Sequence, residues 1–259
     1  MIIDAHVHAG TGDGFTGPWD TEAPLGDYLR RADAAGITHS VLLAAFAADY
    51  ARANAEVAAI VRRAPHRFFA FCFVHATRDR GRIAALVESD HFVGIKVHRH
   101  DAPITREICE VARRQRLPVL YDVSGDVAPI ELFATQYPDV AFVIPHLGSF
   151  ADDWKAQLQL IDMLERHPNV FTDSAGVRRF DLLEQAVARA GAGKLLFGSD
   201  GPWLHPGLEL AKIDALGLAP VDRRRVLAGN FLALTHRARC ARCGRSSRSC
   251  RSRRVPMHA

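Results

Sequence analysis

Short apolar segments, rich in β-branched and aromatic residues, alternate along the chain with longer segments in which apolar residues recur every three or four positions. The short segments lack the polar alternation of half-exposed strands, so they predict strands that are covered on both faces. Eight such segments predict strands over Met1–Ala5, Thr38–Leu43, Phe68–Val74, Val93–Val97, Pro118–Tyr121, Ala141–Ile144, Val170–Thr172 and Leu195–Phe197.

The longer segments have the spacing of amphipathic helices. They predict helices over Leu25–Ala34, Ala51–Arg63, Arg106–Arg116, Asp153–Arg166 and Leu182–Ala190, and a final helix over Asp222–Leu234. Strands and helices in alternation are typical of an α/β fold with a parallel sheet. At 259 residues, the chain has an ordinary length for a single (β/α)8 TIM barrel, which needs about 250 residues.

A doubly wound open sheet would show the same alternation. The polar residues favour the barrel, because side chains of the metal-binding type follow five of the eight predicted strands. Such side chains would converge on one axis only if the sheet closes on itself.

The composition is that of a globular protein, with 48% hydrophobic and 24% charged residues. No apolar run approaches the roughly 20 residues that a membrane-spanning helix needs. The first residues, Met1–His6, lack the cationic and apolar regions of a signal peptide. We therefore expect a cytoplasmic protein that does not bind a membrane.

The formal net charge of +4 comes from one end of the chain. Residues 237–259 hold eight arginines and no acid, so residues 1–236 hold 25 basic and 29 acidic side chains, a net charge of −4. A mildly acidic body predicts no binding of nucleic acid through the folded domain. We expect a domain over residues 1–236 that is complete without a disordered basic tail at 237–259.

The first predicted strand leads into the motif Asp4-x-His6-x-His8. The strand period of two places both imidazoles on one face, where they can hold a metal ion together. The last predicted strand ends in Gly198-Ser199-Asp200, in which small residues leave space around one acid. Asp200 would complement the histidine pair as a ligand, although an acid before Gly-Pro can also cap a helix.

Further candidates follow the other strands. His146 could bind the metal or polarise a substrate oxygen, and Lys96 shares a strand face with His98, where a buried lysine would need an anionic partner. Arg99 and Arg178 could hold a substrate carboxylate. Trp203 or Phe150 could provide an aromatic wall. The expected partner is therefore a small-molecule substrate. The chain could also form a homodimer.

These motifs together resemble the metal-dependent amidohydrolase superfamily. They are most similar to its amidohydrolase-related branch, which contains small barrel hydrolases, lactonases and non-oxidative decarboxylases. The likeness covers nearly all of residues 1–236. The motifs that carry it are Asp4-Ala5-His6-Val7-His8, Gly94-Ile95-Lys96-Val97-His98, Pro145-His146-Leu147-Gly148, Gly198-Ser199-Asp200 and the closing Val226-Leu227-Ala228-Gly229-Asn230-Phe231.

One position departs from the pattern of the branch. The branch commonly has a histidine ligand late in its fifth strand, whereas this chain has Asp122 at the matching place. The third protein ligand is therefore either Asp122 or His98. An oxygen ligand suits zinc, which is the first expectation, and it also suits manganese or iron.

The resemblance implies one divalent cation held by His6, His8, Asp122 and Asp200, with Asp4 orienting the histidines. It implies a hydrolase that attacks a lactone, ester or amide through metal-activated water, with Asp200 moving the proton and His146 steadying the developing oxyanion. Two alternatives stay open. One is a non-oxidative decarboxylase of a carboxylated ring, and the other is a catalytically silent ligand-binding barrel.

Overall fold

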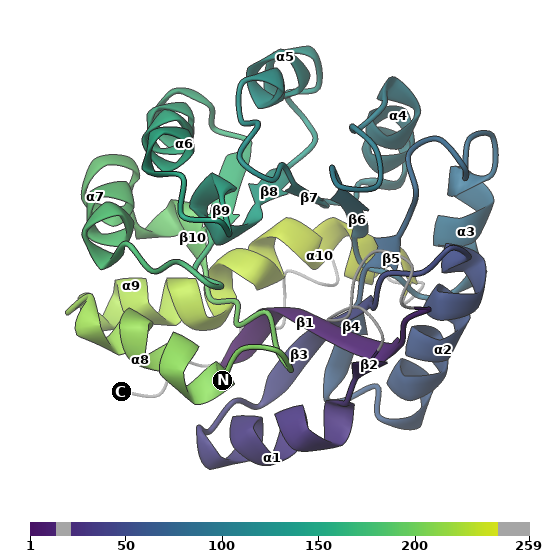
Figure 1. The fold of residues 1–259 in the computed structure, drawn as a ribbon, viewed down its shortest axis with the longest axis horizontal. Coiled ribbons are helices and arrows are strands. Elements are labelled where there is room, and N and C mark those ends of the chain that lie inside the picture. Colours follow the sequence, from purple (N-terminus) through teal and green to yellow (C-terminus); the bar gives the residue numbers. More distant parts are fainter. Residues whose placement is uncertain (14–21, 243–259) are drawn as a thin grey trace.

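The computed structural model describes residues 1–13 and 22–242. Its parallel strands surround a common axis and its helices lie outside them (Figure 1). The strands are β1 (Ile3–Thr11), β3 (His39–Ala44), β4 (Phe68–Ala70), β5 (Cys72–Phe73), β6 (Ile95–His98), β7 (Val119–Asp122), β8 (Phe142–Ile144), β9 (Val170–Asp173) and β10 (Leu195–Leu196), with a short antiparallel β2 (Glu22–Ala23) beside β1.

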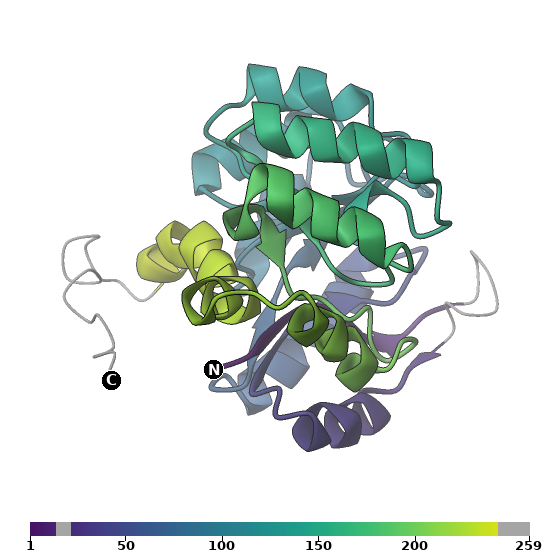
Figure 2. The same ribbon diagram turned by 90° about the vertical axis from the view of Figure 1, so that its left-hand side faces the viewer.

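The outer helices lie around the strands (Figures 1 and 2). Their buried apolar residues belong to the same core as those of the strands. The outer helices are α1 (Leu25–Ala34), α2 (Tyr50–Arg63), α3 (Ile83–Ser89), α4 (Arg106–Gln115), α5 (Pro129–Gln136), α6 (Trp154–Arg166), α7 (Phe180–Ala190) and α8 (Pro206–Ala215). The short α9 (Pro220–Arg224) then continues through a π-helical turn at Arg225–Gly229 into α10 (Asn230–Arg242).

The strands form two ladders, in the orders β2-β1-β3-β4 and β10-β9-β8-β7-β6-β5. The predicted third strand joins them, because β4 pairs with β3 while β5 pairs with β6. At the other seam, the backbone N–H of Ala5 donates to Phe197 O at 2.9 Å and that of His8 donates to Gly201 O at 2.7 Å. The predicted single (β/α)8 barrel is confirmed.

A register shift interrupts β1 between Asp4 and Val7. Ile3, before the shift, and Ala5, within it, pack in the inner core of the barrel. After it, Val7 and Ala9 belong to the outer core, which faces the helices. Such a bulge changes which alternate side chains point inward. The simple strand period of two therefore does not run unbroken through the first motif.

Helix α10 closes the end of the barrel where the strands begin. Its Phe231 ring lies 5.2 Å from the Phe69 ring and 6.3 Å from the Phe71 ring, measured between centroids. The inner core that it completes contains Ile3, Ala5, Val41, Leu43, Phe71, Val93, Leu120, Val143, Leu196 and Ala228. The opposite end of the barrel, where the strands finish, is thereby left for the functional site.

The last helix extends beyond the expected end of the domain at residue 236. It continues to Arg242 and buries Ala238 at 2% exposure. The rest of the predicted tail, residues 243–259, lies outside the described residues. Among the residues that are described, no helix is long and apolar enough to span a membrane.

Candidate metal centre

A cavity of about 520 Å³ opens at the end of the barrel where the strands finish. It brings together most of the side chains singled out in the sequence, from β1, β6, β7 and the segments that follow β8 and β10. Its lining residues are His6, His8, Phe46, Lys96, His98, His100, Asp122, Ser124, His146, Phe150, Ala151, Asp200 and Trp203.

Three buried histidines turn the same ring nitrogen away from the cavity. His8 Nδ1 donates to Ala44 O at 2.8 Å, and His146 Nδ1 donates to Ala175 O at 2.8 Å. His6 Nδ1 pairs with Asp173 Oδ2 at 2.9 Å. Because Nδ1 holds the proton in each of these bonds, Nε2 of His6 and of His8 is left with a free lone pair, the state in which imidazole binds a metal ion, whereas Nε2 of His146 faces Asp122 Oδ2 at 3.3 Å.

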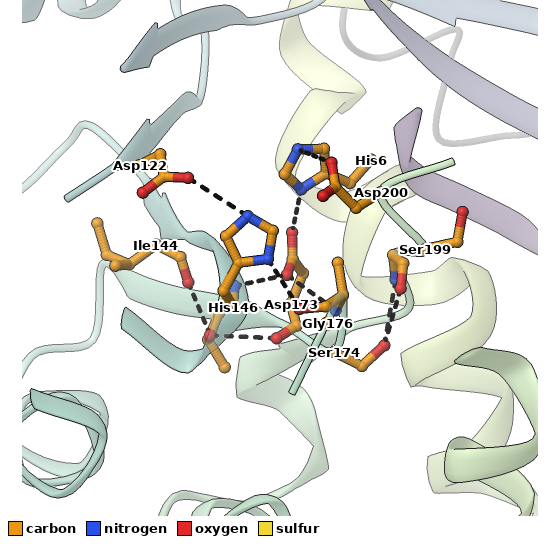
Figure 3. Close-up of polar contacts among 12 residues, drawn as sticks. His6, Asp122, Ile144, His146, Asp173, Ser174, Gly176, Ser199 and Asp200 are labelled. Atoms are coloured by element: carbon orange, nitrogen blue, oxygen red, sulfur yellow. Dashed lines mark hydrogen bonds and ion pairs between the residues drawn. The ribbon is translucent and has the colours of Figure 1, made fainter. Parts of the chain in front are cut away.

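The free nitrogens lie around the carboxylate of Asp200. His6 Nε2 is 3.5 Å and His8 Nε2 is 3.6 Å from Asp200 Oδ1. His6, His146 and Asp200 also form a group whose candidate ligand atoms all lie within 4.8 Å of one another. Figure 3 shows His6 and Asp200 close together, with His146 nearby and its Nε2 turned toward Asp122.

Asp200 and His146 both have left-handed backbone, with φ values of 56° and 59°. This conformation is unfavourable for residues other than glycine and persists only where neighbouring groups hold it. The N–H of Asp200 donates to His6 O at 2.8 Å, and the N–H of His146 donates to Asp173 Oδ1 at 2.9 Å. The backbone that aims both side chains is thus fixed by hydrogen bonds to the same cluster.

Asp173 is the main residue that the sequence analysis missed. It is fully buried at the end of β9, and its two oxygens bond His6 Nδ1 and the N–H of His146 (Figure 3). Burial by itself would raise the pKa of Asp173, but the charge and hydrogen bond of His6, together with His146, outweigh it and lower that pKa. The position could have been noticed, because an acid ends this strand as Asp122 and Asp200 end theirs.

The strands approach closely at this anchor. A methyl group on Gly198 would lie 3.0 Å from His6 Cβ and 3.3 Å from Asp173 Cβ. The small residues predicted to clear space near Asp200 therefore have a specific purpose, since a side chain at Gly198 would push apart His6 and the carboxylate that holds it.

Asp4 does not face the cavity. Its carboxylate accepts from Tyr28 OH of α1 at 2.9 Å, from Ser199 N–H at 2.9 Å and from His6 N–H at 3.3 Å. On the outer side of β1, Asp4 therefore links the backbone N–H of His6 to the backbone N–H of Ser199, the residue before Asp200. This arrangement fits the expected orienting role of Asp4, with Tyr28 and Ser199 as partners that the sequence did not suggest.

Asp122 and His98, the two candidates for a third ligand, bond each other. His98 Nδ1 accepts from the N–H of His100 at 3.0 Å, so its proton is on Nε2, which donates to Asp122 Oδ2 at 3.1 Å. The same oxygen lies 3.3 Å from His146 Nε2. Neither Asp122 nor His98 belongs to the compact group of candidate ligand atoms found among the described residues.

Burial and neighbouring charges set the protonation of the cluster. Burial, with the charge of Lys96, lowers the pKa of His6, and burial lowers the pKa of His8 well below its usual value. Burial also disfavours charge on His146, but the hydrogen bond and charge of Asp122 outweigh it and raise the pKa of His146 to about 9. A cation that binds His146 Nε2 must displace that proton.

Two arginines expected at the substrate lie elsewhere. Arg99 pairs with Asp126 at 2.5 Å. Arg178 is 69% exposed at its side chain and lies 3.9 Å from Asp152. Neither lines the cavity. Both follow their strands in sequence, but the structure does not bring their side chains to the cavity, and their contact with substrate stays a prediction.

The cluster has the features expected of a metal centre. His6 Nε2 is buried and has no hydrogen-bond partner among the residues that the structure describes, which is costly for a polar atom unless a ligand satisfies it. Asp122, Asp173 and Asp200 are three buried acids near one buried base, Lys96. Nitrogen and carboxylate donors in this combination suit a divalent transition metal ion.

Comparison with known proteins agrees with this chemistry. Residues 3–234 match the family model described as amidohydrolase. No curated protein matches the chain significantly. Solved structures with the same fold include 5-carboxyvanillate decarboxylase from Sphingomonas paucimobilis, which is 14% identical with a TM-score of 0.69 over 91% of this chain and 98% of that one.

Two further structures extend the range of activities. A protein from Pseudomonas putida designated a 2-pyrone-4,6-dicarboxylic acid hydrolase is 18% identical, with a TM-score of 0.68 over 91% of this chain and 97% of that one. A manganese-bound dihydroxybenzoic acid decarboxylase from a Polaromonas species is 17% identical, with a TM-score of 0.67 over 91% of this chain and 96% of that one. At these identities the likeness establishes the fold. The family match covers most of the chain, which therefore belongs to the amidohydrolase family of metal-dependent enzymes.

Proposed function

We propose that this protein is a hydrolase that holds one divalent cation through the Nε2 atoms of His6, His8 and His146 and through the carboxylate of Asp200. One observation supports this ligand set most strongly. All three histidines donate Nδ1–H to fixed acceptors, which leaves Nε2 of His6 and His8 free within 3.6 Å of Asp200 and turns Nε2 of His146 into the cavity beside Asp122. In this set Asp122 is not a ligand, because its Oδ2 already pairs with His98 and lies beside His146.

Zinc is the cation we propose first. Three imidazoles and one carboxylate form a common zinc donor set, and manganese or iron could use the same atoms. A divalent cation at this place would supply acidified water and polarisation of a substrate carbonyl.

The residues of the chain would manage the proton and the substrate. Asp200 Oδ1 lies within 3.6 Å of two histidine nitrogens, so it can accept a proton from water at the centre and pass it to a leaving group. His98 and Asp122 hold the side of the cavity next to His146. Phe46, Phe150 and Trp203 enclose the cavity and would keep bulk water from the reacting bond.

The related structures include both hydrolases and decarboxylases, so the reaction needs a direct test. Zinc-loaded protein is incubated in water labelled with heavy oxygen with a panel of lactones, esters, amides and aromatic carboxylic acids. Hydrolysis places the label in the product acid. Release of carbon dioxide without label in the organic product would replace our proposal with a decarboxylase.

A variant connects the activity to the centre. Asp200→Asn should lower the rate on the order of a hundredfold or more, because it removes a proton acceptor and weakens a ligand. Asp162→Asn, which changes an acid paired with Arg189 on the outer surface, should leave the rate unchanged. Undiminished activity of Asp200→Asn would contradict the proposed site.

Metal content separates an enzyme from a silent barrel. Elemental analysis should find about one divalent metal ion per chain, and the doubly substituted His6→Ala/His8→Ala protein should lose it. A chain that neither holds metal nor binds added zinc or manganese would favour the ligand-binding barrel.

A further inference from the structure

The Ser174–Val177 loop, which directly follows β9, bonds the candidate centre through Ala175. The carbonyl of Ala175 accepts from His146 Nδ1 at 2.8 Å, and its N–H donates to Asp173 Oδ1 at 3.1 Å. Because the acceptor of Nδ1–H sets the orientation of an imidazole ring, the direction of His146 Nε2 depends on where this carbonyl lies. The loop therefore has to be held in place.

Two side chains of α8 hold the loop. Lys212 Nζ donates to Ser174 O at 3.0 Å and to Val177 O at 2.9 Å. Glu209 Oε2 accepts from the N–H of Gly176 at 2.9 Å. Glu209 and Lys212 also pair with each other at 2.6 Å, three residues apart on one helix face. One ion pair thus bonds three backbone groups of the loop.

The ion pair of α8 is largely shielded from water. The side chain of Glu209 is 12% exposed and that of Lys212 is 20% exposed, whereas Glu110 and Arg113, a pair of the same spacing and the same 2.6 Å distance in α4, are 36% and 48% exposed. Burial raises the pKa of Glu209, although the hydrogen bond and charge of Lys212 act in the opposite direction. Buried groups that are bonded on several sides have little freedom to move, so this pair can fix the loop.

The pair does not take part in the chemistry directly. Neither Glu209 nor Lys212 is among the described residues that line the cavity. Their bonds to the loop end on the residues before and after Ala175, and the two polar backbone groups of Ala175 itself bond the centre. The connection from α8 to His146 therefore runs through the backbone of one loop.

We propose that Glu209 and Lys212 are positioning residues, which set the orientation of the His146 ring through the carbonyl of Ala175. This inference rests on the proposed function, in which His146 Nε2 is a ligand of the cation. Its test observes the hydrogen bond of His146 in zinc-free protein, so the inference and the proposed function can fail separately.

The test measures how fast the Nδ1–H protons of two histidines exchange with water, by nuclear magnetic resonance of the full chain with ¹⁵N-labelled histidine. The signals are assigned from those missing in His146→Gln and His8→Gln. His8 is an internal reference, because its Nδ1 donates at the same 2.8 Å to Ala44 O on β3, away from the loop. In Lys212→Met we expect the His146 proton to exchange at least tenfold faster and the His8 proton to stay within twofold.

Two further variants show whether the effect is specific. Arg113→Met removes the cation of the exposed pair in α4 and should leave both histidine protons unchanged. Lys212→Arg keeps a cation with several donors and should hold the His146 proton within threefold of its native exchange rate. If Lys212→Met accelerates both histidines equally, α8 contributes only to general stability, and the inference is overturned.

Lys212→Met leaves Glu209 as a poorly solvated acid without its cation, which also lowers stability. The double variant Glu209→Gln/Lys212→Met avoids this problem, because it removes both charges while the amide oxygen can still accept from Gly176 N–H. It should show the same selective change at His146, since two loop carbonyls still lose their donor. Each variant is first checked for a native thermal transition. Unchanged His146 exchange in either folded variant would contradict the positioning role.

Zinc affinity separates this inference from the proposed function. Competition with a chromogenic chelator should show that Lys212→Met binds zinc roughly tenfold more weakly, because the ring of one ligand is no longer held. Faster exchange at His146 with native zinc affinity would support the positioning role and would contradict His146 as a ligand. If the native chain binds no zinc at all, the exchange rates of His146 and His8 still decide the inference.

Discussion

Asp173 holds two histidines of the candidate centre at once. One oxygen fixes the ring of His6 and the other fixes the backbone of His146. Carboxylates that bond the outer nitrogen of a histidine ligand set its tautomer and its orientation. The third group that this side chain satisfies is the N–H of Ala175, whose carbonyl in turn accepts from His146 Nδ1. The geometry of the centre therefore depends on a residue that does not line the cavity.

We predict that Asp173→Asn weakens zinc binding about 10- to 100-fold. Both oxygens of Asp173 accept hydrogen bonds, whereas an amide has only one oxygen and carries no negative charge. Competition with a chromogenic chelator measures the affinity. Asp181→Asn, at an exposed acid paired with Arg179, is the matched control and should bind zinc normally. Equal affinities of the two variants would show that Asp173 has no orienting role.

At the scale of elements, α10 has a structural task that is separate from the chemistry. It covers the inner core at the end of the barrel opposite the cavity, where Phe231 packs between the rings contributed by the third strand segment. Barrel ends of this kind contribute stability, whereas the ends where the strands finish contribute function.

Phe231→Ala should lower the free energy of unfolding by about 3 to 5 kcal/mol, since a large buried side chain leaves a cavity behind. Leu208→Ala, at an apolar side chain of α8 that is 69% exposed, should change it by no more than about 0.5 kcal/mol. Urea unfolding measures both values. Zinc affinity of folded Phe231→Ala should be native, because Phe231 packs in the inner core and is not among the described residues that line the cavity. A loss near that of Leu208→Ala would mean that α10 does not stabilise the barrel.

The end of α10 gives a second prediction at this scale. The sequence suggested that residues 237–259 are dispensable, but α10 runs to Arg242 and Ala238 is buried. A chain ending at Arg242 should keep its stability within about 0.5 kcal/mol, whereas one ending at His236 should lose roughly 1 to 3 kcal/mol. Thermal unfolding of the two truncated chains compares them directly. Equal stability of both would restore the boundary inferred from composition.

At the scale of the whole molecule, the candidate centre joins distant parts of the chain. Its proposed ligands come from β1, from the segment after β8 and from the segment after β10. The backbone hydrogen bonds from Ala5 and His8 join the first and last strands at the same seam. A cation bound there would therefore oppose separation of the first and last strands.

Zinc at about 100 times its dissociation constant should stabilise the native chain by about 2.7 kcal/mol. This corresponds to a rise of the thermal midpoint by roughly 5 to 10 °C for a chain of this size. His6→Ala/His8→Ala should show no rise at the same zinc concentration. A similar rise in that variant would mean that zinc stabilises the protein at another place.

Much of the fold could be predicted from the sequence. The eight apolar segments mark the positions of the parallel strands, because strands buried on both faces need no polar alternation. The motif of His6 and His8, and the acid at Asp200, also indicated the candidate site, since such side chains at strand ends have few structural uses. The sequence could not tell that Arg99 and Arg178 lie outside the cavity lining, because a position just after a strand does not determine which way a loop turns its side chain.

The sequence by itself determined which residue types end the strands and that the chain forms a barrel of β–α units, since these follow from local periodicity and burial. Only the tertiary structure decided how these residues pair. The bulge in β1 turns Asp4 away from His6 and His8, Asp122 bonds His98 instead of joining the compact cluster, and Asp173 connects His6 to His146. Each of these outcomes depends on contacts between strands that are far apart in the chain, which periodicity along one strand does not encode.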